Sequence, residues 1–297
     1  MRYSEMDENA LQQRVSTAVA RLESCNLCAR HCGVNRLAGE TGVCRIGRSL
    51  KVSSAFAHHG EEDIIRGYGG SGTIFVAGCS LHCAFCQNFS VSHKEEGREC
   101  SPETLARILE DLAGQGCHNF NFVTPTHCMP QILEGLSLYL SQPDAKALPL
   151  VWNTGCYDTV ESLHLLDGIV DVYMPDFKFM SMEASQRYLE ATDYPEIAMA
   201  AIAEMVRQVG PVRLGADGTI ERGVLVRHLV IPGMLEDTEQ ILNHLMAEYG
   251  TSIAVNVMGQ YRPCGRSGLF AEIDRPLDYG EWLKARRMAV DAGLRLA

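Results

Sequence analysis

The sequence contains no long apolar stretch and no recognisable targeting signal. No run among its 297 residues approaches the ~18 consecutive apolar residues of a membrane-spanning helix. The first nine residues, from Met1 to Asn9, are polar and acidic, whereas a secretory signal peptide has a basic start followed by an apolar segment. We therefore expect a cytoplasmic protein that does not enter a membrane.

Basic residues are in deficit. The chain has 26 lysines and arginines against 37 aspartates and glutamates, which gives a formal net charge of −11. This charge repels nucleic acid at long range, and no basic run offers a phosphate-binding surface. The glycine-rich run at 67–72 lacks the spacing of a dinucleotide or phosphate loop. Nucleic acid is therefore disfavoured as a partner.

Cysteine, by contrast, is abundant, with 12 residues. Without a secretory signal, so many cysteines indicate metal binding rather than disulfides. The remaining composition, 46% hydrophobic and 21% charged, is typical of a globular protein. A chain of this length can bury a substantial core, and we expect one main domain with a small appendage.

Short apolar runs alternate with amphipathic segments along most of the chain. The six expected strands are 73–77, 120–123, 149–152, 169–174, 225–231 and 253–257. Helices are expected between them, and Asp158 with Glu161 should form a capping box at the start of one. This alternation predicts an α/β fold with parallel strands. Six units are too few for a closed eight-stranded barrel.

Three cysteines, Cys79, Cys83 and Cys86, follow the first expected strand at C-x3-C-x2-C spacing. They lie on the loop that leaves the carboxyl end of a strand, where α/β proteins build their sites. A cubic iron–sulfur cluster held by three thiolates keeps one iron free for another ligand. The alternatives are a buried cluster of loop cysteines or part of a zinc site.

A second group of cysteines lies near the N-terminus at C-x2-C-x3-C-x11-C spacing. Its members are Cys25, Cys28, Cys32 and Cys44. Four thiols suit a tetrahedral zinc site, and a [4Fe–4S] cluster uses the same ligands, so both remain open, with a slight preference for zinc. We expect residues 1–50 to form a helix and this four-cysteine knuckle, and residues 51–297 to form the main domain.

The cluster motif, with aromatic Phe85 before its third cysteine, resembles the signature of radical S-adenosylmethionine (radical SAM) enzymes. Segments 123–127, 173–178 and 227–233 extend the resemblance to the PflX-type branch, which is similar to pyruvate formate-lyase activating enzyme. The resemblance covers the chain from Cys25 to about Pro263. It implies an open, TIM-like (β/α)6 partial barrel that binds a [4Fe–4S] cluster and S-adenosylmethionine.

The resemblance also implies which side chains lie along S-adenosylmethionine. The expected contacts are Phe85, Thr124, Thr126, His127, Asn153, Thr154, Asp176, Lys178, Arg227 and His228. Phe85 would pack on adenine, and the threonines and His127 stand where relatives carry a Gly-Gly-Glu segment. Ordinary structural roles are the alternative, such as an ion pair between Asp176 and Lys178.

By the same resemblance, a reduced cluster would cleave S-adenosylmethionine to a 5′-deoxyadenosyl radical that abstracts hydrogen from a substrate. The leading hypothesis is a glycyl-radical-enzyme activase, whose substrate is a protein and whose electron donor is a flavodoxin or ferredoxin. One alternative is radical modification of a peptide or small molecule. Another is a metal-binding scaffold without catalytic activity.

Three further cysteines, Cys128, Cys156 and Cys264, each follow an expected strand end. They could form a third metal site or supply a thiol to the substrate, although free buried cysteine is usually inert. The run from His58 to Asp63 contains several metal-ligand residue types. Because adjacent side chains point apart, we expect a loop that approaches the cluster region.

Overall fold

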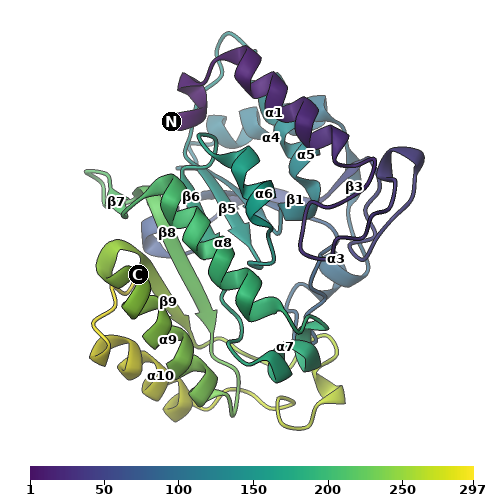
Figure 1. Cartoon of the computed structure of the whole chain (residues 1–297). Coiled ribbons are helices and arrows are strands. Elements are labelled where there is room, and N and C mark those ends of the chain that lie inside the picture. Colours follow the sequence, from purple (N-terminus) through teal and green to yellow (C-terminus); the bar gives the residue numbers. More distant parts are fainter.

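The computed structural model describes all residues from 1 to 297 and contains one nine-stranded sheet (Figure 1). Six of its strands are parallel, and each pairs with the next of the six in chain order. They are β2 (Ser71–Val76), β4 (Phe120–Val123), β5 (Leu150–Thr154), β6 (Val172–Pro175), β8 (Ile220–Leu229) and β9 (Ala254–Met258). The expected mixed α/β fold with a central parallel sheet is confirmed.

Helices connect the strands and cover the sheet. They are α4 (Pro102–Gly114), α5 (Met129–Leu140), α6 (Val160–Leu163), α7 (Met182–Leu189), α8 (Tyr194–Val209), α9 (Leu235–Tyr249) and α10 (Tyr279–Asp291). Helix α4 shows why these segments are helical: Ser101 caps its N-terminus by accepting a hydrogen bond from the Thr104 backbone N–H, and Pro102 occupies its first turn. Its apolar face then buries Leu105 and Leu109 against the core. None of the helices is long and apolar enough to cross a membrane.

The sheet is extended at one edge by two antiparallel strands that the sequence did not reveal. Strand β1 (Leu50–His58) pairs with β2, and β3 (Arg98–Cys100) pairs with β1. The outer part of β1 is only partly buried, and its polar residues break the apolar alternation that identifies a strand. The loop that we expected at residues 58–63 is present: it starts after His58, the last residue of β1, and covers residues 59–62. It is followed by the short helix α2 (Asp63–Arg66).

The N-terminal segment lies across the helical layer. The helix expected within residues 1–50 is α1 (Glu8–Ala20), which packs against α5 and buries Leu11, Val15 and Ala18 (Figure 1). Residues 21–49 contain only one short 3₁₀ turn of regular structure, and they lead from α1 to β1. The four-cysteine segment is thus a loop structure, and it contacts the loops that follow β2, β4 and β5.

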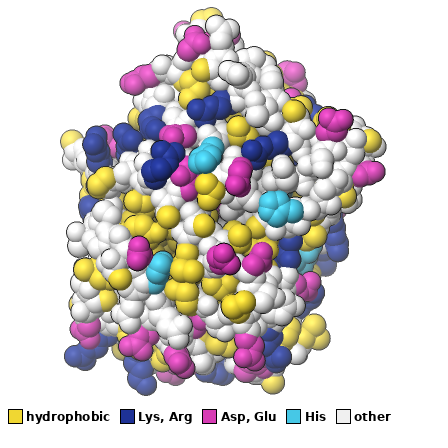
Figure 2. Space-filling view, in the orientation of Figure 1, with side chains coloured by type: hydrophobic (Ala, Val, Ile, Leu, Met, Phe, Trp, Pro, Cys, Tyr) yellow, Lys and Arg dark blue, Asp and Glu magenta, His cyan; other side chains and the backbone are white.

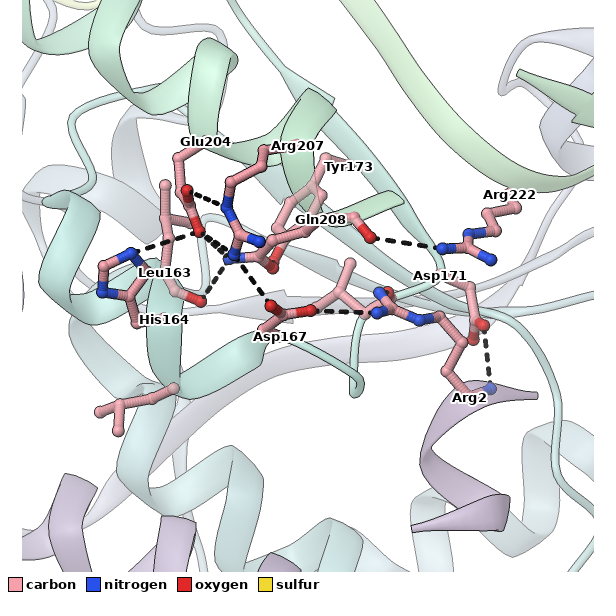
Figure 3. A network of polar contacts seen from close by, with 12 residues as sticks. Arg2, Leu163, His164, Asp167, Asp171, Tyr173, Glu204, Arg207, Gln208 and Arg222 are labelled. Atoms are coloured by element: carbon pink, nitrogen blue, oxygen red, sulfur yellow. Dashed lines mark hydrogen bonds and ion pairs between the residues drawn. The ribbon is translucent and has the colours of Figure 1, made fainter. Parts of the chain in front are cut away.

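A network of charged side chains closes the end of the sheet where β6 begins (Figure 3). The Arg2 backbone N–H donates to Asp171 at 3.2 Å, and its guanidinium donates to Asp167 at 3.0 Å. Arg207 of α8 binds Asp167 at 2.9 Å and Glu204 at 2.7 Å. These contacts fasten the N-terminus and α8 to the loop before β6.

The expected capping box at Asp158 and Glu161 is wrong. Helix α6 begins one residue later, and Thr159 is the cap: its hydroxyl accepts a hydrogen bond from the Ser162 backbone N–H at 3.3 Å. Asp158 is instead buried, where its carboxylate accepts from the hydroxyl of Thr154 at 2.6 Å. Asp and Thr are both good N-cap residues. Asp158 does not cap the helix because its buried carboxylate accepts the hydrogen bond of the Thr154 hydroxyl.

Candidate functional site

A cavity of about 430 Å³ lies at the carboxyl ends of the parallel strands. This volume is within the usual range of small-molecule sites, and the position is where parallel α/β sheets place them. Its lining includes the loop after β2, the ends of β4, β5 and β6, and the side chain of Arg227 from β8. Segments far apart in the sequence therefore meet around one space.

Cys79, Cys83 and Cys86 all line this cavity, as their position after the strand predicted. Burial raises the pKa of the Cys83 and Cys86 thiols, although Lys178 opposes the shift at Cys83 and a hydrogen bond from Ser92 opposes it at Cys86. Thiols of this kind give up their protons when a metal binds. Three thiols facing one cavity suit an iron–sulfur cluster whose remaining iron faces the same space.

Gly78, which precedes the first of these cysteines, holds the loop against the four-cysteine segment. Its φ is +81°, which favours glycine. A Cβ added there would lie 2.5 Å from the Cys44 carbonyl oxygen and 2.7 Å from Ile46. Only a residue without a side chain therefore allows the two cysteine-bearing loops to approach this closely.

A compact ion network lines part of the same cavity. Asp176, just after β6, accepts hydrogen bonds from Lys178 at 2.8 Å and from Arg227 at 2.9 Å. Arg227 also donates to the Asn153 side-chain oxygen at 2.7 Å. Burial favours the neutral form of Asp176, but Arg227 and Lys178 outweigh it and hold the pKa of the carboxyl below its usual value.

At Lys178, burial and the neighbouring charge also shift the pKa in opposite directions, and the neighbouring charge again prevails. Burial would lower the pKa of its ammonium group, but the Asp176 carboxylate raises that pKa above the ordinary value. The predicted residues Asn153, Asp176, Lys178 and Arg227 are therefore brought together as two cations around one carboxylate. Such a charge arrangement in a cavity is typical of a ligand site.

Glu61 is a site residue that the sequence analysis missed. It lines the cavity, lies 3.6 Å from the Arg227 guanidinium, and accepts a hydrogen bond from the Asn121 amide at 3.4 Å. Burial raises the pKa of Glu61 to about 7, although Arg227 opposes the shift. The available signal was Arg227 itself, because a cation within an apolar strand requires anionic partners.

Thr124, directly after β4, lines the cavity with a strained backbone. Its φ is +57°, and its N–H donates to the Asn153 carbonyl at 2.7 Å. The left-handed conformation is a genuine outlier for a β-branched residue, and such outliers concentrate at functional sites. Thr154 also lines the cavity, with its hydroxyl donating to Asp158.

Three of the expected cofactor contacts, Thr126, His127 and His228, lie outside this cavity. The Thr126 hydroxyl donates to buried Asp158 at 2.7 Å. His228 follows Arg227 in β8, and successive side chains of a strand point to opposite faces. It therefore bonds the Phe177 carbonyl at 2.8 Å and Thr238 at 2.9 Å instead.

His127 is fully enclosed, and burial lowers its pKa to about 4. Its Nε2 lies 2.8 Å from the Ala77 carbonyl, so the neutral ring donates from that nitrogen. It does not line the main cavity, where we expected it. It lines the small pocket that the four N-terminal cysteines share. The proline-containing loop turns the ring towards the N-terminal segment.

Phe85 lies in the wall of the main cavity and is almost fully buried. Its ring meets Phe179 edge-on at a centroid distance of 5.9 Å, and it also lies 6.2 Å from Tyr261. These contacts fix the ring between two of the cavity cysteines. An apolar surface is thus available beside the thiols.

The four N-terminal cysteines line one small second pocket. Gly42 helps to close it, because a Cβ at that position would lie 2.6 Å from the Cys32 sulfur. The Val43 backbone N–H points to the same sulfur at 3.5 Å. No three histidine, cysteine, aspartate or glutamate side chains are arranged as a metal site in this structure, and this holds for both cysteine groups.

The structure does not bring Cys128, Cys156 and Cys264 together. Cys156 is buried, with its sulfur 3.6 Å from the Ala198 carbonyl, and Cys264 is partly exposed on another loop. Cys128 is buried near Arg36 and the four-cysteine pocket, and burial raises its pKa to about 12. The alternative of a third metal site is therefore not supported, and Cys128 and Cys156 are buried as inert free cysteines usually are.

Comparison with known proteins gives one long sequence match. The uncharacterized protein MJ0674 of Methanocaldococcus jannaschii is 35% identical over 298 residues, which cover 97% of this chain and 80% of that protein. Residues 65–136, which include the three cavity cysteines, match the family described as a 4Fe-4S single cluster domain.

Solved structures of Streptococcus suis SuiB are similar at a lower level. The structure bound to S-adenosylmethionine has 10% identity and a TM-score of 0.47 over 74% of this chain. The structure bound to the precursor peptide SuiA has 11% identity and a TM-score of 0.48. The chain spans about half the length of these structures, 48% and 46% respectively. These values do not carry an argument about function.

Proposed function

The chain belongs to the same family as the uncharacterized protein MJ0674 of Methanocaldococcus jannaschii, and we propose that it is a radical SAM enzyme. One observation carries the proposal: the three cysteines of a matched 4Fe-4S domain line the same cavity as a buried ion network. The six parallel strands, with no pairing between β9 and β2, are consistent with an open (β/α)6 partial barrel.

The charges of the network suit the aminoacyl end of S-adenosylmethionine. Lys178 and Arg227 offer donors to a carboxylate, and Asp176 and Asn153 offer oxygen atoms to an ammonium group or a ribose hydroxyl. When bound, the cluster and S-adenosylmethionine would supply an electron and a 5′-deoxyadenosyl radical. The protein would contribute binding, orientation and exclusion of water.

The apolar and backbone parts of the cavity complete the proposed binding mode. Phe85, held by its aromatic neighbours, offers a flat surface for adenine beside the thiols. Thr124 and Thr154 place their backbones and side chains between the strand ends and the ion network. Thr126, His127 and His228 are left out of the proposal because their polar atoms meet other partners.

The reaction type is tested by the formation of 5′-deoxyadenosine. Anaerobically reconstituted protein should contain an oxygen-sensitive [4Fe–4S] cluster and release 5′-deoxyadenosine when reduced with S-adenosylmethionine present. Cys79→Ala, Cys83→Ala or Cys86→Ala should abolish the product. Cys100→Ala, a buried cysteine at the far edge of the sheet, is the matched control and should keep it. Full turnover in a variant of the first three would refute the cluster assignment.

For the substrate, we propose that the enzyme is a glycyl-radical-enzyme activase. The proposal rests on the resemblance to the activating enzymes, on the unpaired side of the sheet, and on a net charge that disfavours nucleic acid. On the face in Figure 2, basic side chains are interspersed with acidic and hydrophobic ones. A flavodoxin or ferredoxin would supply the electron.

The activase proposal predicts a glycine-centred radical on a partner protein. Incubation with reductant, S-adenosylmethionine and a cognate glycyl radical enzyme should give an electron paramagnetic resonance doublet that changes when the glycine is deuterated. If 5′-deoxyadenosine forms without any such signal, radical modification of a peptide or small molecule replaces this proposal. If neither forms, the metal-binding scaffold is the better account.

We also propose that Cys25, Cys28, Cys32 and Cys44 hold a structural metal centre, either zinc or a second iron–sulfur cluster. Their shared pocket supports this proposal. Metal analysis of the full chain with Cys79, Cys83 and Cys86 changed to alanine should find one residual zinc ion or one residual cluster. Cys25→Ser should then lower both metal content and stability, because metal binding is coupled to folding.

A further inference from the structure

Arg36 is unusual among the charged side chains of this protein. It is fully buried, at 0% exposure, and none of the other lysines and arginines is buried to this extent. It lies within the four-cysteine segment and lines the pocket that the four thiols share. A guanidinium cannot shed its charge by deprotonation, so this cation must be stabilised where it is.

The hydrogen bonds of Arg36 reach only neutral oxygens and one sulfur. Its Nε and Nη2 donate to the Gly47 carbonyl at 3.1 and 2.9 Å, and its Nη1 donates to the His127 carbonyl at 2.7 Å. The same Nη1 lies 3.7 Å from the Cys25 sulfur. Arg36 forms no ion pair with a carboxylate, and the ionisable side chains around it include those of Cys25, Cys44 and Cys128, which are uncharged as thiols.

The contrast with Arg227 shows what is missing. Arg227 is less buried, yet it has Asp176 at 2.9 Å and Glu61 at 3.6 Å as anionic partners. A buried charge without a partner is strongly destabilising. Protonated thiols would leave Arg36 in that condition. Four thiolates around a divalent ion or an iron–sulfur cluster carry net negative charge and would supply the missing counter-charge.

We propose that Arg36 is the internal counter-ion of an anionic metal–tetrathiolate centre formed by Cys25, Cys28, Cys32 and Cys44. This rests on the structural metal centre proposed above. The guanidinium stabilises the thiolates of the loaded centre and penalises the metal-free fold. Arg36 is thus a positioning residue that couples metal binding to folding, whichever metal the centre holds.

The test compares metal affinity in three variants of the full chain that lacks the cavity cysteines. Arg36→Gln removes the charge but keeps a donor, and Arg36→Lys keeps the charge. Zinc and iron are quantified first, and affinity is then measured by competition with a chelator. Arg36→Gln should lower the affinity about 10- to 100-fold, as changes to outer-shell partners of metal ligands do. Arg36→Lys should recover most of that loss.

The matched control is Arg48→Gln, from the same segment. Arg48 is 39% exposed and pairs with Glu134 at 2.5 Å, so its charge is already compensated. Metal affinity should not change in this variant. If Arg36→Gln proves too unstable to titrate, the rate of metal release to excess chelator is measured at a temperature where it stays folded, and release should be faster than from Arg36→Lys and Arg48→Gln.

Thermal unfolding separates a charge effect from a packing effect. If Arg36 is a counter-ion, Arg36→Gln should lower the midpoint of the metal-loaded protein by several degrees more than that of the metal-free protein. Equal shifts in both forms, with unchanged affinity, would mean that Arg36 only packs, and would overturn this inference alone. Finding no metal in the parent chain would overturn the proposed centre, and the counter-ion with it.

Discussion

The two ends of strand β6 carry two ion networks that look alike in a contact diagram and differ in surroundings. Before the strand, Arg207 pairs with Asp167 (Figure 3), and their side chains are 56% and 32% exposed. After the strand, Lys178 and Arg227 are each 15% exposed around Asp176, and all three line a cavity of about 430 Å³.

This difference in exposure distinguishes a network that only holds segments of the chain together from a network that lines a binding site. The exposed network satisfies its own charges and holds the N-terminus, and each such pair contributes about 0–1 kcal/mol. The buried network gathers two cations around one carboxylate beside an enclosed space, where charge interactions are stronger and desolvation is costly. Ion pairs alone therefore do not identify a site, but their burial around a cavity does.

The largest expected effect is on stability. It comes from replacing the central carboxylate of the network after β6, which is Asp176, and is compared with Asp167 in the network before β6. Asp176→Asn leaves Lys178 and Arg227 without their shared partner, so it should cost roughly 2–3 kcal/mol of stability, somewhat less than a fully dry pair would. It should also weaken S-adenosylmethionine binding while the iron content stays intact. The counterpart Asp167→Asn should cost no more than about 1 kcal/mol and leave binding unchanged. Denaturant unfolding and calorimetric titration measure both.

Loss of iron in Asp176→Asn would assign this residue a structural role at the cluster loop instead. Equal destabilisation by the two substitutions would mean that the burial difference between the networks has no energetic consequence.

A smaller effect, on the order of 2 kcal/mol, concerns how the free energy of unfolding depends on pH. Its sign should be opposite for one glutamate in each network, Glu61 and Glu204. Burial raises the pKa of Glu61 from 4.5 to about 7, so the folded protein binds this proton more tightly than the unfolded chain. The stability contributed by Glu61 is present at low pH and is lost as pH rises from about 4.5 to 7. Glu61→Gln should therefore match the parent protein near pH 5 and exceed its stability near pH 8.

Glu204 at the exposed end should behave in the reverse way. Hydrogen bonding to Arg207 lowers the pKa of the Glu204 carboxyl, so its contribution is present at neutral pH and is lost as pH falls. Glu204→Gln should lower the melting temperature at pH 7, and the loss should shrink on acidification. Melting curves of both variants across this range would show the same sign if the assignment of the two environments were wrong.

The smallest effect concerns backbone strain. Thr124→Gly should relieve the left-handed conformation and raise stability by up to about 1 kcal/mol, while weakening S-adenosylmethionine binding. Glu190→Gly is the control, because Glu190 has a similar φ of +55° at the end of α7 and lies outside the cavity. It should gain stability without a change in binding. A loss of stability in Thr124→Gly would show that the threonine side chain outweighs the strain.

Cysteine spacing and strand periodicity made the main architecture predictable. The thiols Cys79, Cys83 and Cys86 share a cavity because they leave the end of a strand, and the six parallel strands lie within a few residues of the apolar runs. Asp176, Lys178 and Arg227 meet because each lies near the carboxyl end of its strand. These features depend on local sequence pattern and on the common direction of parallel strands.

The features that escaped prediction depend on tertiary partners. Glu61 lies on the loop after β1, and its role depends on Arg227 and Asn121, which come from distant strands. Asp158 has the sequence of a helix cap but is buried with Thr126 and Thr154. The family resemblance implied that His228 lies along the cofactor with Arg227, but strand alternation sends the two side chains apart.

The contact at Gly78 bears on how this architecture can change during evolution. The loop after β2 and the N-terminal cysteine loop meet at Gly78 with no room for a side chain, so the backbone of each loop must fit that of the other. A chimera that takes only one of these loops from a relative would place a loop of different backbone shape against the other at the Cys44 carbonyl. The two loops should therefore be inherited as one module, and recombination between them should be selected against even where each loop alone is intact.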